Sequence, residues 1–372
     1  MKVLVTGAAG FIGKNLVERF RNGSHEDTEL LLFTLDSSDD DLAAYCSECD
    51  FVFHLAGVNR PQDPAEFVEG NVDLTAQILN LLAQRADPCP VLLSSSAQAS
   101  LDNPYGASKL AAEETVRAYG RDTGAEVFIY RLPGVFGKWS QPNYNSVVAT
   151  FCHNVARDLP ISVSNPATAL TLAYIDDVVD EFLRAKLGEA TRVDDGFCEV
   201  PVTHEVTLGR IVELLAEFRA GRETLEVPDT SDAFTLKLYA TYLSHLPADA
   251  FSYPLDMNVD ERGSFTEIIR SADRGQFSVN VIKPGITKGN HWHDTKNEKF
   301  AVVSGRGVIR FRKVGESEIN EYPVSGDRIE VVDIPPGYTH SIENLGDADM
   351  VTFMWANECF DPDRPDTYWL EV

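Results

Sequence analysis

The chain has 372 residues, of which 44% are hydrophobic and 24% charged, so it can bury more than one core and is neither disordered nor a single small binding module. With 32 basic and 58 acidic residues its formal net charge is −26, and no Lys/Arg-rich run offsets that charge. A field of this sign repels a phosphate backbone, so nucleic acid is not an expected partner. The length favours two domains.

The chain offers no sign of export or of a membrane span. Its N-terminus leads into a glycine loop within a few residues, which leaves no room for the apolar stretch of a signal peptide. No apolar run approaches the roughly 18 residues that suggest a span. The six cysteines are scattered, as expected for reduced thiols, and we interpret the C-x-x-C pair Cys46 and Cys49 as structural. We therefore expect a cytoplasmic protein.

The first half alternates short apolar runs with helical patterns, which predicts a parallel sheet covered by helices. Between the first two runs, Ile12, Leu16 and Phe20 recur every four residues and predict a helix with one apolar face. This arrangement is a βαβ unit at the start of an α/β domain. The predicted strands are residues 3–5, 30–34, 51–55, 91–94 and 127–131.

A glycine loop lies between the first predicted strand and helix. Gly7, Gly10 and Gly13 form a G-x-x-G-x-x-G. The first glycine permits a tight turn, the second lets the backbone approach a pyrophosphate, and the third lets helix and strand pack closely. Asp36, at the end of the second strand, is placed to bind the adenosine ribose and taken alone favours NADH, although a turn or N-cap carboxylate explains it equally well.

A Y-x-x-x-K pair follows the fourth predicted strand. Tyr105 and Lys109 lie four apart on a predicted helix, so their side chains leave the same face. A nearby ammonium favours the phenolate and lets the tyrosine exchange a proton with an alcohol or ketone near neutral pH. Upstream, residues 94–96 are serines that end an apolar strand, where a hydroxyl can bind the reacting carbonyl.

With the glycine loop, these residues resemble the extended short-chain dehydrogenase/reductases that act on nucleotide sugars. The resemblance covers roughly residues 1–245 and includes residues 54–57, 131–137 and 174–178. It implies a Rossmann-like fold. The coenzyme contacts that it implies are Gly7, Gly10, Phe11, Ile12, Gly13, Asp36, Leu55, Ala56, Gly57 and Lys109.

The same resemblance implies catalytic roles. Tyr105 would protonate the carbonyl oxygen during reduction, Lys109 would lower the pKa of Tyr105 and bind the nicotinamide ribose, and Ser96 would orient the carbonyl. Gly134 stands where many members have Asn, which puts one backbone-positioning contact in doubt. The short Ser96–Tyr105 spacing leaves the serines at 94 and 95 open for the role given to Ser96.

After about residue 253 the pattern changes to short alternating runs with turn signals, at residues 277–281, 308–311, 329–331 and 350–355. These runs predict an antiparallel barrel or sandwich. Pro247 and Pro254 suit a linker better than the interior of an element. We therefore place the domain boundary near residue 250, giving domains 1–250 and 251–372.

The second domain carries a set of metal-ligating residues: His291, His293, Glu298 and His340. The first two histidines lie two apart and would share one face of a strand, with the glutamate entering from the next turn or strand. Three imidazoles and a carboxylate suit Zn²⁺, and also Fe²⁺, Mn²⁺ or Ni²⁺.

The spacing of these ligands resembles the two motifs of the cupin jelly-roll barrel, at residues 285–305 and 335–344. The early glycine of the second motif is missing at Ile329, although Gly326 lies nearby. The ligand positions are unaffected by that departure. The resemblance therefore implies a metal cupin as the second domain.

A nucleotide-sugar reductase joined to a metal cupin resembles the bifunctional capsular-polysaccharide enzymes of the CapF (WbjC) type, as do residues 54–61, 136–139, 285–293 and 366–368. That resemblance implies a route to UDP-N-acetyl-L-fucosamine. The cupin would epimerise C3 of a UDP-2-acetamido-2,6-dideoxy-4-hexulose, and the reductase would reduce the C4 ketone to UDP-2-acetamido-2,6-dideoxy-L-talose. It also implies NADPH, Zn²⁺ and a homodimer.

The two steps are chemically consistent, because a 4-ketone acidifies the C3 proton and a cation that polarises the ketone stabilises the resulting enolate. Lys296, between the ligands, is a candidate base, although it can also be read as a surface charge in a loop. Two alternatives stay open. In the first, the cupin would be a structural or dimerising module whose metal clamps the fold. In the second, it would be a metal-dependent oxygenase whose ligands hold Fe²⁺.

Overall fold

The computed structural model describes residues 1–23, 27–63, 65–193 and 196–372. The chain divides into two compact units. The first comprises Met1–Ala216 and Ser231–Pro247, and the second comprises Glu217–Thr230 and Ala248–Val372. Among the described residues, no helix has the length and apolarity needed to cross a membrane.

A five-stranded parallel sheet forms the centre of the first unit, in the order β2-β1-β3-β4-β5. The order reverses between β1 and β3, and ligands of such sheets bind at that point, outside the carboxyl ends of the strands. All five predicted strands are confirmed, with ends that differ by one or two residues: β1 Lys2–Thr6, β2 Glu29–Phe33, β3 Phe51–His54, β4 Val91–Ser96 and β5 Val127–Leu132.

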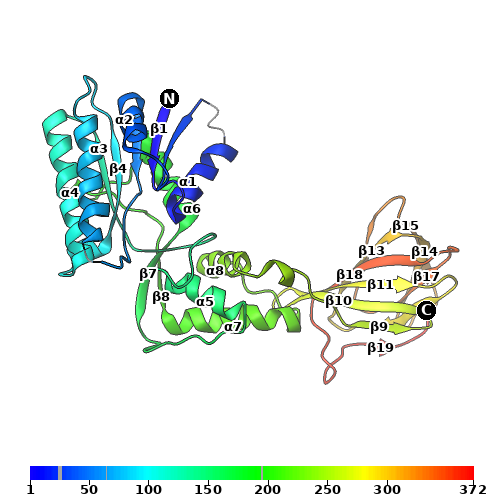
Figure 1. Ribbon diagram of the computed structural model, residues 1–372. Coiled ribbons are helices and arrows are strands. Elements are labelled where there is room, and N and C mark those ends of the chain that lie inside the picture. Colours follow the sequence, from blue (N-terminus) through cyan, green and yellow to red (C-terminus); the bar gives the residue numbers. More distant parts are fainter. Residues whose placement is uncertain (24–26, 64, 194–195) are drawn as a thin grey trace. The chain divides into compact units, whose positions relative to one another are not determined.

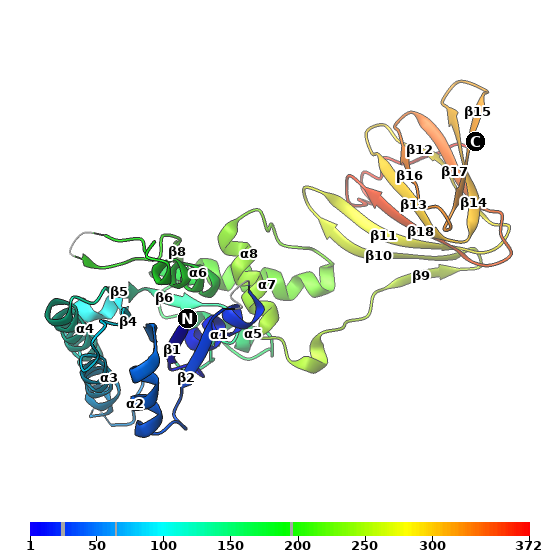
Figure 2. The same ribbon diagram turned by 90° about the horizontal axis from the view of Figure 1, so that it is seen from above.

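Helices cover both faces of this sheet (Figures 1 and 2). Because side chains alternate along a strand, Val3 and Val5 of β1 join one buried cluster while Leu4 joins the other. The first cluster packs against α1 (Phe11–Asn22) and α6 (Ile175–Lys186). The second packs against α2 (Asp39–Glu48), α3 (Leu74–Leu82) and α4 (Pro104–Thr123). Cys46 and Cys49 lie fully buried in this second cluster as free thiols, as their structural interpretation requires.

The start of α4 is set by local sequence. The Asn103 side chain accepts a hydrogen bond from the backbone N–H of Gly106 at 2.8 Å, and Pro104 occupies the first helical position, where its missing N–H costs nothing. Gly124 ends the helix with a φ of 75°. These caps place Tyr105 in the first turn of the helix.

The rest of the first unit forms a small sheet and further helices, which the sequence pattern did not resolve. A π-helical turn, Val68–Asp73, leads into α3, and a short 3-10 turn, Ala97–Ser100, follows β4. The small sheet has the order β6-β7-β8. The bounds are β6 Gly134–Phe136, α5 Val147–Val155, β7 Ala169–Tyr174, β8 His204–Thr207, α7 Leu208–Thr224 and α8 Ala233–Ser244.

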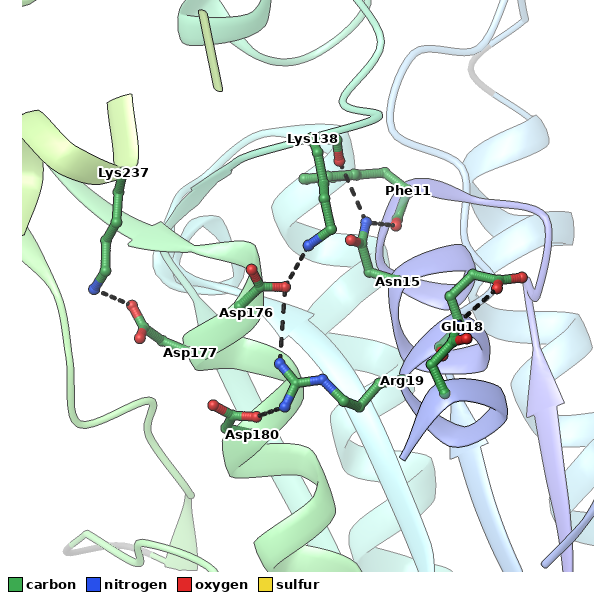
Figure 3. A network of polar contacts seen from close by, with 10 residues as sticks. Phe11, Asn15, Glu18, Arg19, Lys138, Asp176, Asp177, Asp180 and Lys237 are labelled. Carbon is green, nitrogen blue, oxygen red and sulfur yellow. Dashed lines mark hydrogen bonds and ion pairs between the residues drawn. The ribbon is translucent and has the colours of Figure 1, made fainter. Parts of the chain in front are cut away.

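Ion pairs around the start of α6 join these parts of the first unit (Figure 3). The acidic residues of α6 lie in or near its first turns, where carboxylates also favour the helix dipole. They form ion pairs with basic side chains of α1, of the segment after β6 and of α8. The pairs are Arg19–Asp180 at 2.5 Å, Lys138–Asp176 at 2.5 Å and Lys237–Asp177 at 2.6 Å.

The strands of the second unit form two antiparallel sheets, in the orders β16-β13-β18-β11-β10-β9 and β15-β14-β17-β12-β19. An apolar cluster lies between them and includes Phe300, Ile309, Phe311 and Ile342. This all-β unit is cupin-like. Its strands are β9 Met257–Asp260, β10 Gly263–Ser271, β11 Gly275–Ile282, β12 Thr287–Trp292, β13 Glu298–Ser304, β14 Arg306–Lys313, β15 Ile319–Ser325, β16 Val331–Ile334, β17 Tyr338–Asn344, β18 Met350–Ala356 and β19 Tyr368–Trp369.

One predicted strand of the second unit is present but displaced toward the C-terminus. The run 329–331 was expected to form a strand, but Ile329 is exposed outside any strand and β16 begins only at Val331. The reason is a turn in front of it. Gly326 donates its backbone N–H to the carbonyl of Gly305, and Arg328 donates to Ser325, so the chain reverses before it can pair.

Candidate functional site

The glycine loop has the geometry of a dinucleotide site. Gly7 has a φ of 66°, and a Cβ there would lie 2.7 Å from the backbone nitrogen of Ala56. A Cβ at Gly13 would lie 2.2 Å from the carbonyl oxygen of Gly7, so only glycine lets α1 approach β1 this closely. Gly10 caps α1 without a side-chain acceptor, which leaves the first backbone N–H groups of the helix available to an anion.

The segment after β3 lies between the glycine loop and the catalytic helix. The backbone N–H of Ala56 donates to the Thr6 hydroxyl at 3.2 Å. A Cβ at Gly57 would lie 3.4 Å from Lys109 Nζ. The fold thus brings together the predicted coenzyme residues of three separate segments, including Leu55, which is half-buried.

The remaining predicted coenzyme residues lie at the edge of the sheet formed by the carboxyl ends of β1 and β2. Phe11 and Ile12 are half-buried in the first turn of α1. Asp36 is exposed in the turn that follows β2. Since β2 and β1 are parallel neighbours, the carboxyl ends of both strands meet at one edge of the sheet. Asp36 could therefore reach a ribose bound beside the glycine loop.

Lys109 is buried and donates from Nζ to the carbonyl oxygen of Ser94 at 2.9 Å. Burial lowers the pKa of Lys109 to about 8, against the opposing charge of Glu113. Burial raises the pKa of Tyr105, against the opposing effect of a hydrogen bond with Ser96. The expected lowering of the Tyr105 pKa is therefore not seen in the chain alone, because the cost of burying a phenolate is larger.

The three serines at the end of β4 have different surroundings. Ser94 is buried and its Oγ faces the carbonyl of His54 at 3.5 Å. Ser95 is also buried and donates to Glu113 Oε1 at 2.5 Å. Ser96 is half-buried and is the serine whose hydroxyl bonds to Tyr105. Of the three hydroxyls, that of Ser96 lies beside the candidate acid.

Sequence reasoning missed an ion pair behind this site, between a buried glutamate and a half-buried arginine. Glu113 is 1% exposed and lies one helical step of four residues after Lys109. Arg131, on β5, binds its carboxylate through Nη2 at 2.7 Å and Nε at 3.0 Å. The four-residue repeat could have drawn attention to Glu113, but nothing in the sequence reveals that Arg131 is its partner.

Two further segments approach Tyr105. The Phe67 ring lies 5.8 Å from the Tyr105 ring between centroids. Tyr144, after β6, is close enough for its charge to influence the Tyr105 pKa. Arg60 donates from Nη1 to the carbonyl oxygen of Asn143 at 3.3 Å, which joins the segments that follow β3 and β6. These segments were not recognised as part of the site from sequence.

The predicted metal ligands converge in the second unit. They come from three strands and the residue after one of them: His291 on β12, His293 just beyond it, Glu298 at the start of β13 and His340 on β17. One ligand atom from each lies within 4.8 Å of all the others. Two of the separations are 3.4 Å from His293 Nε2 to Glu298 Oε2 and 3.5 Å from His340 Nε2 to the same oxygen.

These four residues fit a divalent cation. Ligands at about 2.1 Å from a tetrahedral ion lie about 3.4 Å apart, close to the spacings seen. His293 Nε2, Glu298 Oε2 and both ring nitrogens of His340 are buried without a hydrogen-bond partner among the described residues, an arrangement that is costly unless a cation is bound. Burial lowers the pKa of His291 to about 4, which keeps its imidazole neutral and able to bind a metal.

Lys296 is buried rather than exposed. The interpretation of this residue as a surface charge is therefore wrong, because its loop folds inward against the C-terminal segment. Its backbone N–H donates to Asp366 Oδ2 at 2.8 Å, and its Nζ lies 5.9 Å from the centroid of the Phe360 ring. Asp366 is another residue of this region that sequence reasoning did not assign.

Comparisons with known proteins find a matching family for each half of the chain. Residues 3–190 match the NAD dependent epimerase/dehydratase family, and residues 258–368 match the polysaccharide biosynthesis C-terminal domain. The chain is 45% identical to UDP-2-acetamido-2,6-beta-L-arabino-hexul-4-ose reductase of Pseudomonas aeruginosa, over 100% of this chain and 99% of that protein.

Solved structures give the same picture. The capsular polysaccharide assembling protein CapF of Staphylococcus aureus is 53% identical, with a TM-score of 0.94 and complete coverage of both chains. UDP-glucuronic acid 4-epimerase of Bacillus cereus, in complex with NAD, matches 58% of this chain and 83% of its own, at 19% identity and a TM-score of 0.51. The latter likeness concerns the fold alone.

Proposed function

The chain belongs to the NAD-dependent epimerase/dehydratase family and is of the CapF type, with a polysaccharide-biosynthesis C-terminal domain, and from this we propose that it is a bifunctional enzyme of capsular-polysaccharide precursor synthesis. The cupin-like unit epimerises C3 of a UDP-2-acetamido-2,6-dideoxy-4-hexulose. The first unit then reduces the C4 ketone to the L-talo product. The observation that carries the proposal is 45% identity over the full length to a reductase named for a 4-hexulose of this kind.

In the reduction, Tyr105 donates its proton to the C4 oxygen, and the Ser96 hydroxyl holds that oxygen beside it. The coenzyme, when bound, supplies the hydride that reduces C4. Lys109, with its pKa of about 8, carries a proton near neutral pH and places a positive charge next to the nicotinamide ribose. Burial raises the pKa of Tyr105, and the hydrogen bond with Ser96 opposes that rise, in the direction that proton donation requires.

In the epimerisation, His291, His293, Glu298 and His340 hold a divalent cation, for which we propose Zn²⁺. A cation held by these residues would supply Lewis-acid stabilisation to the ketone oxygen as the C3 proton leaves. We assign Lys296 as the base that removes this proton. Its burial beside the ligand set supports the assignment.

We propose NADPH as the coenzyme, on the resemblance to CapF-type enzymes. The exposed carboxylate of Asp36 and the absence of Lys or Arg between residues 34 and 41 favour NADH instead. The ratio of kcat/KM for the two coenzymes decides between them. A preference for NADH above about tenfold, roughly 1.4 kcal/mol, would reverse the assignment.

A second candidate function keeps the reductase and gives the cupin a structural or dimerising role. Four protein ligands favour it, since a closed tetrahedral zinc site leaves no position for substrate. An Fe²⁺ oxygenase is the remaining alternative.

Metal analysis of protein purified without added metal identifies the ion, and the mass of the assembly in solution tests the proposed homodimer. We propose that the reaction takes place in the cytoplasm.

The test of the main proposal is incubation with the UDP-4-hexulose in D₂O, with and without NADPH. We expect deuterium at C3 in both cases and consumption of NADPH only when the ketone is reduced. Reduction without deuterium at C3 would support the structural role of the cupin. Deuterium incorporation only in the presence of coenzyme would place the epimerisation in the first unit.

A further inference from the structure

The C-terminal segment of the chain lies along β12, the strand that carries the ligand His291 and leads directly into His293. Its strand β19 pairs antiparallel with β12, placing Trp369 opposite His291. The backbone N–H of Leu370 donates to the carbonyl of Asn290 at 2.9 Å. The Thr339 hydroxyl, next to the ligand His340, donates to the carbonyl of Leu370. We call residues 366–372 the tail.

Asp366, the first residue of the tail, holds the loop between two ligands. Its carboxylate accepts hydrogen bonds from three consecutive backbone N–H groups: Asp294 at 2.9 Å, Thr295 at 3.0 Å and Lys296 at 2.8 Å. The Thr295 hydroxyl adds a fourth at 3.2 Å. A charged acceptor for successive N–H groups fixes the loop strongly. This loop carries Lys296, the base assigned above.

The same residue also contacts a ligand directly. His293 Nδ1 lies 2.6 Å from the backbone carbonyl oxygen of Asp366. A carbonyl only accepts, so Nδ1 carries the proton and the lone pair is left on Nε2, which faces Glu298 Oε2 at 3.4 Å. Asp366 has a φ of 37°, a left-handed conformation that Asp tolerates better than most residues. The turn presents both the carboxylate and the carbonyl to the ligand loop.

We propose that Asp366 is a positioning residue of the metal centre. Its carbonyl selects the metal-binding tautomer of His293, and its carboxylate holds the loop that places Lys296. The inference rests on the proposed metal site and epimerase function, and it adds that the tail is part of that site. Partners of this kind typically change metal affinity by 10- to 100-fold.

The test uses Asp366→Asn and Asp366→Gly in the full-length chain. Both residues accept a left-handed φ, and both keep the backbone carbonyl. Asn replaces one acceptor oxygen with an amide that faces N–H groups, whereas Gly removes the carboxylate entirely. The matched control is Asp361→Asn in the segment before the tail, since the Asp361 carboxylate binds the N–H of Asp363 at 2.9 Å and pairs with Arg364 at 3.7 Å.

Without the carboxylate the turn no longer holds the Asp366 carbonyl against His293 Nδ1. Zn²⁺ affinity, measured by competition with a chelator, should therefore fall by about 10- to 100-fold in both Asp366 variants and stay unchanged in Asp361→Asn. Thermal unfolding of the metal-free proteins should be similar, which separates weakened binding from misfolding. At saturating Zn²⁺, deuterium exchange at C3 without coenzyme should still be slower in the variants, because the loop of Lys296 is no longer held. Reduction of a substrate already inverted at C3 should be unchanged.

The outcomes separate this inference from the proposal beneath it. Wild-type binding of Zn²⁺, with affinity and exchange within twofold of wild type in both Asp366 variants, would overturn the positioning role alone. Failure of the wild-type chain to bind Zn²⁺ would overturn the metal site and this inference together. Weakened affinity with normal metal-free stability supports it.

Discussion

At the scale of single residues, Tyr105 is the group on which the reduction depends. We expect Tyr105→Phe to lower the rate of reduction by roughly 10² to 10⁴, because the substitution removes the proton donor and little volume. The measurement is coenzyme oxidation with the 4-hexulose, alongside thermal unfolding and metal content, which should not change. Tyr119→Phe on the same helix is the control, since the Tyr119 hydroxyl bonds to the backbone N–H and carbonyl of Cys89. Near wild-type turnover by Tyr105→Phe would remove the assignment.

His54 should make the stability of the first unit depend on pH. It is buried between the hydroxyls of Thr6 at 2.7 Å and Thr75 at 2.8 Å, and burial, with the charge of Lys109, lowers its pKa to about 3. An unfolded histidine titrates near 6.5. Below that pH the unfolded chain therefore binds a proton at His54, whereas His54 of the folded chain stays neutral until about pH 3. The free energy of unfolding should fall by about 1.4 kcal/mol for each pH unit between 6.5 and 3.

The measurement compares thermal midpoints at pH 7 and pH 5 for wild type and His54→Asn. The variant lacks this titration, so its midpoint should fall less on acidification. Other groups, such as His245 with a pKa lowered by burial to about 4, titrate in both proteins and cancel in the difference. Equal pH slopes in the two proteins would contradict the prediction.

At the scale of elements, α4 carries Tyr105, Lys109 and Glu113 on one face, in steps of four residues. Glu113 bonds to Ser95 and to Arg131 and opposes the effect of burial on Lys109. The helix therefore links the proton donor, the cation beside it and the carboxylate that sustains its charge. Lys109 and Glu113 also hold the end of β4 against α4, through their hydrogen bonds with Ser94 and Ser95.

We expect Glu113→Gln to lower the pKa of Lys109 further below about 8, because a negative charge that favours the ammonium is lost. The alkaline limb of the kcat/KM profile for reduction should then move to lower pH. Breaking the pair between the buried Glu113 and the half-buried Arg131 should also lower stability, by less than the roughly 3 to 5 kcal/mol typical of a fully buried pair. Glu114→Gln, at the exposed neighbouring position, should change neither. An unshifted profile in a folded Glu113→Gln variant would show that this carboxylate does not act on Lys109.

At the scale of the whole molecule, the residues of each candidate site come from one unit: the glycine loop, Tyr105 and Lys109 from the first, and the metal ligands from the second. His291→Ala should weaken metal binding and stop coenzyme-independent exchange at C3. Reduction of a substrate already inverted at C3 should continue. The measurements are deuterium content by mass spectrometry and coenzyme oxidation. Persistent exchange in a metal-free variant would mean that the base acts without a cation.

The sequence by itself determined the features that depend on near neighbours. The apolar runs and the four-residue spacing of Leu16 and Phe20 determined the βαβ start, because period 2 and period 3.6 are local properties of the backbone. The same holds for the glycine loop and for the pairing of Tyr105 with Lys109 on one helical face. The ligand set was identified because three histidines and a glutamate at this spacing match the pattern of a metal site and few other patterns.

Only the tertiary structure decided which long-range neighbours these residues have. It turned Ser95 to Glu113 and left Ser96 beside Tyr105, where the spacing alone allowed any of three serines. It buried Lys296 under Asp366, a residue 70 positions away. A periodic pattern reports which face a side chain leaves but not what the rest of the chain places against that face. Burial and pKa depend on that second fact, so they were settled only by the packed chain.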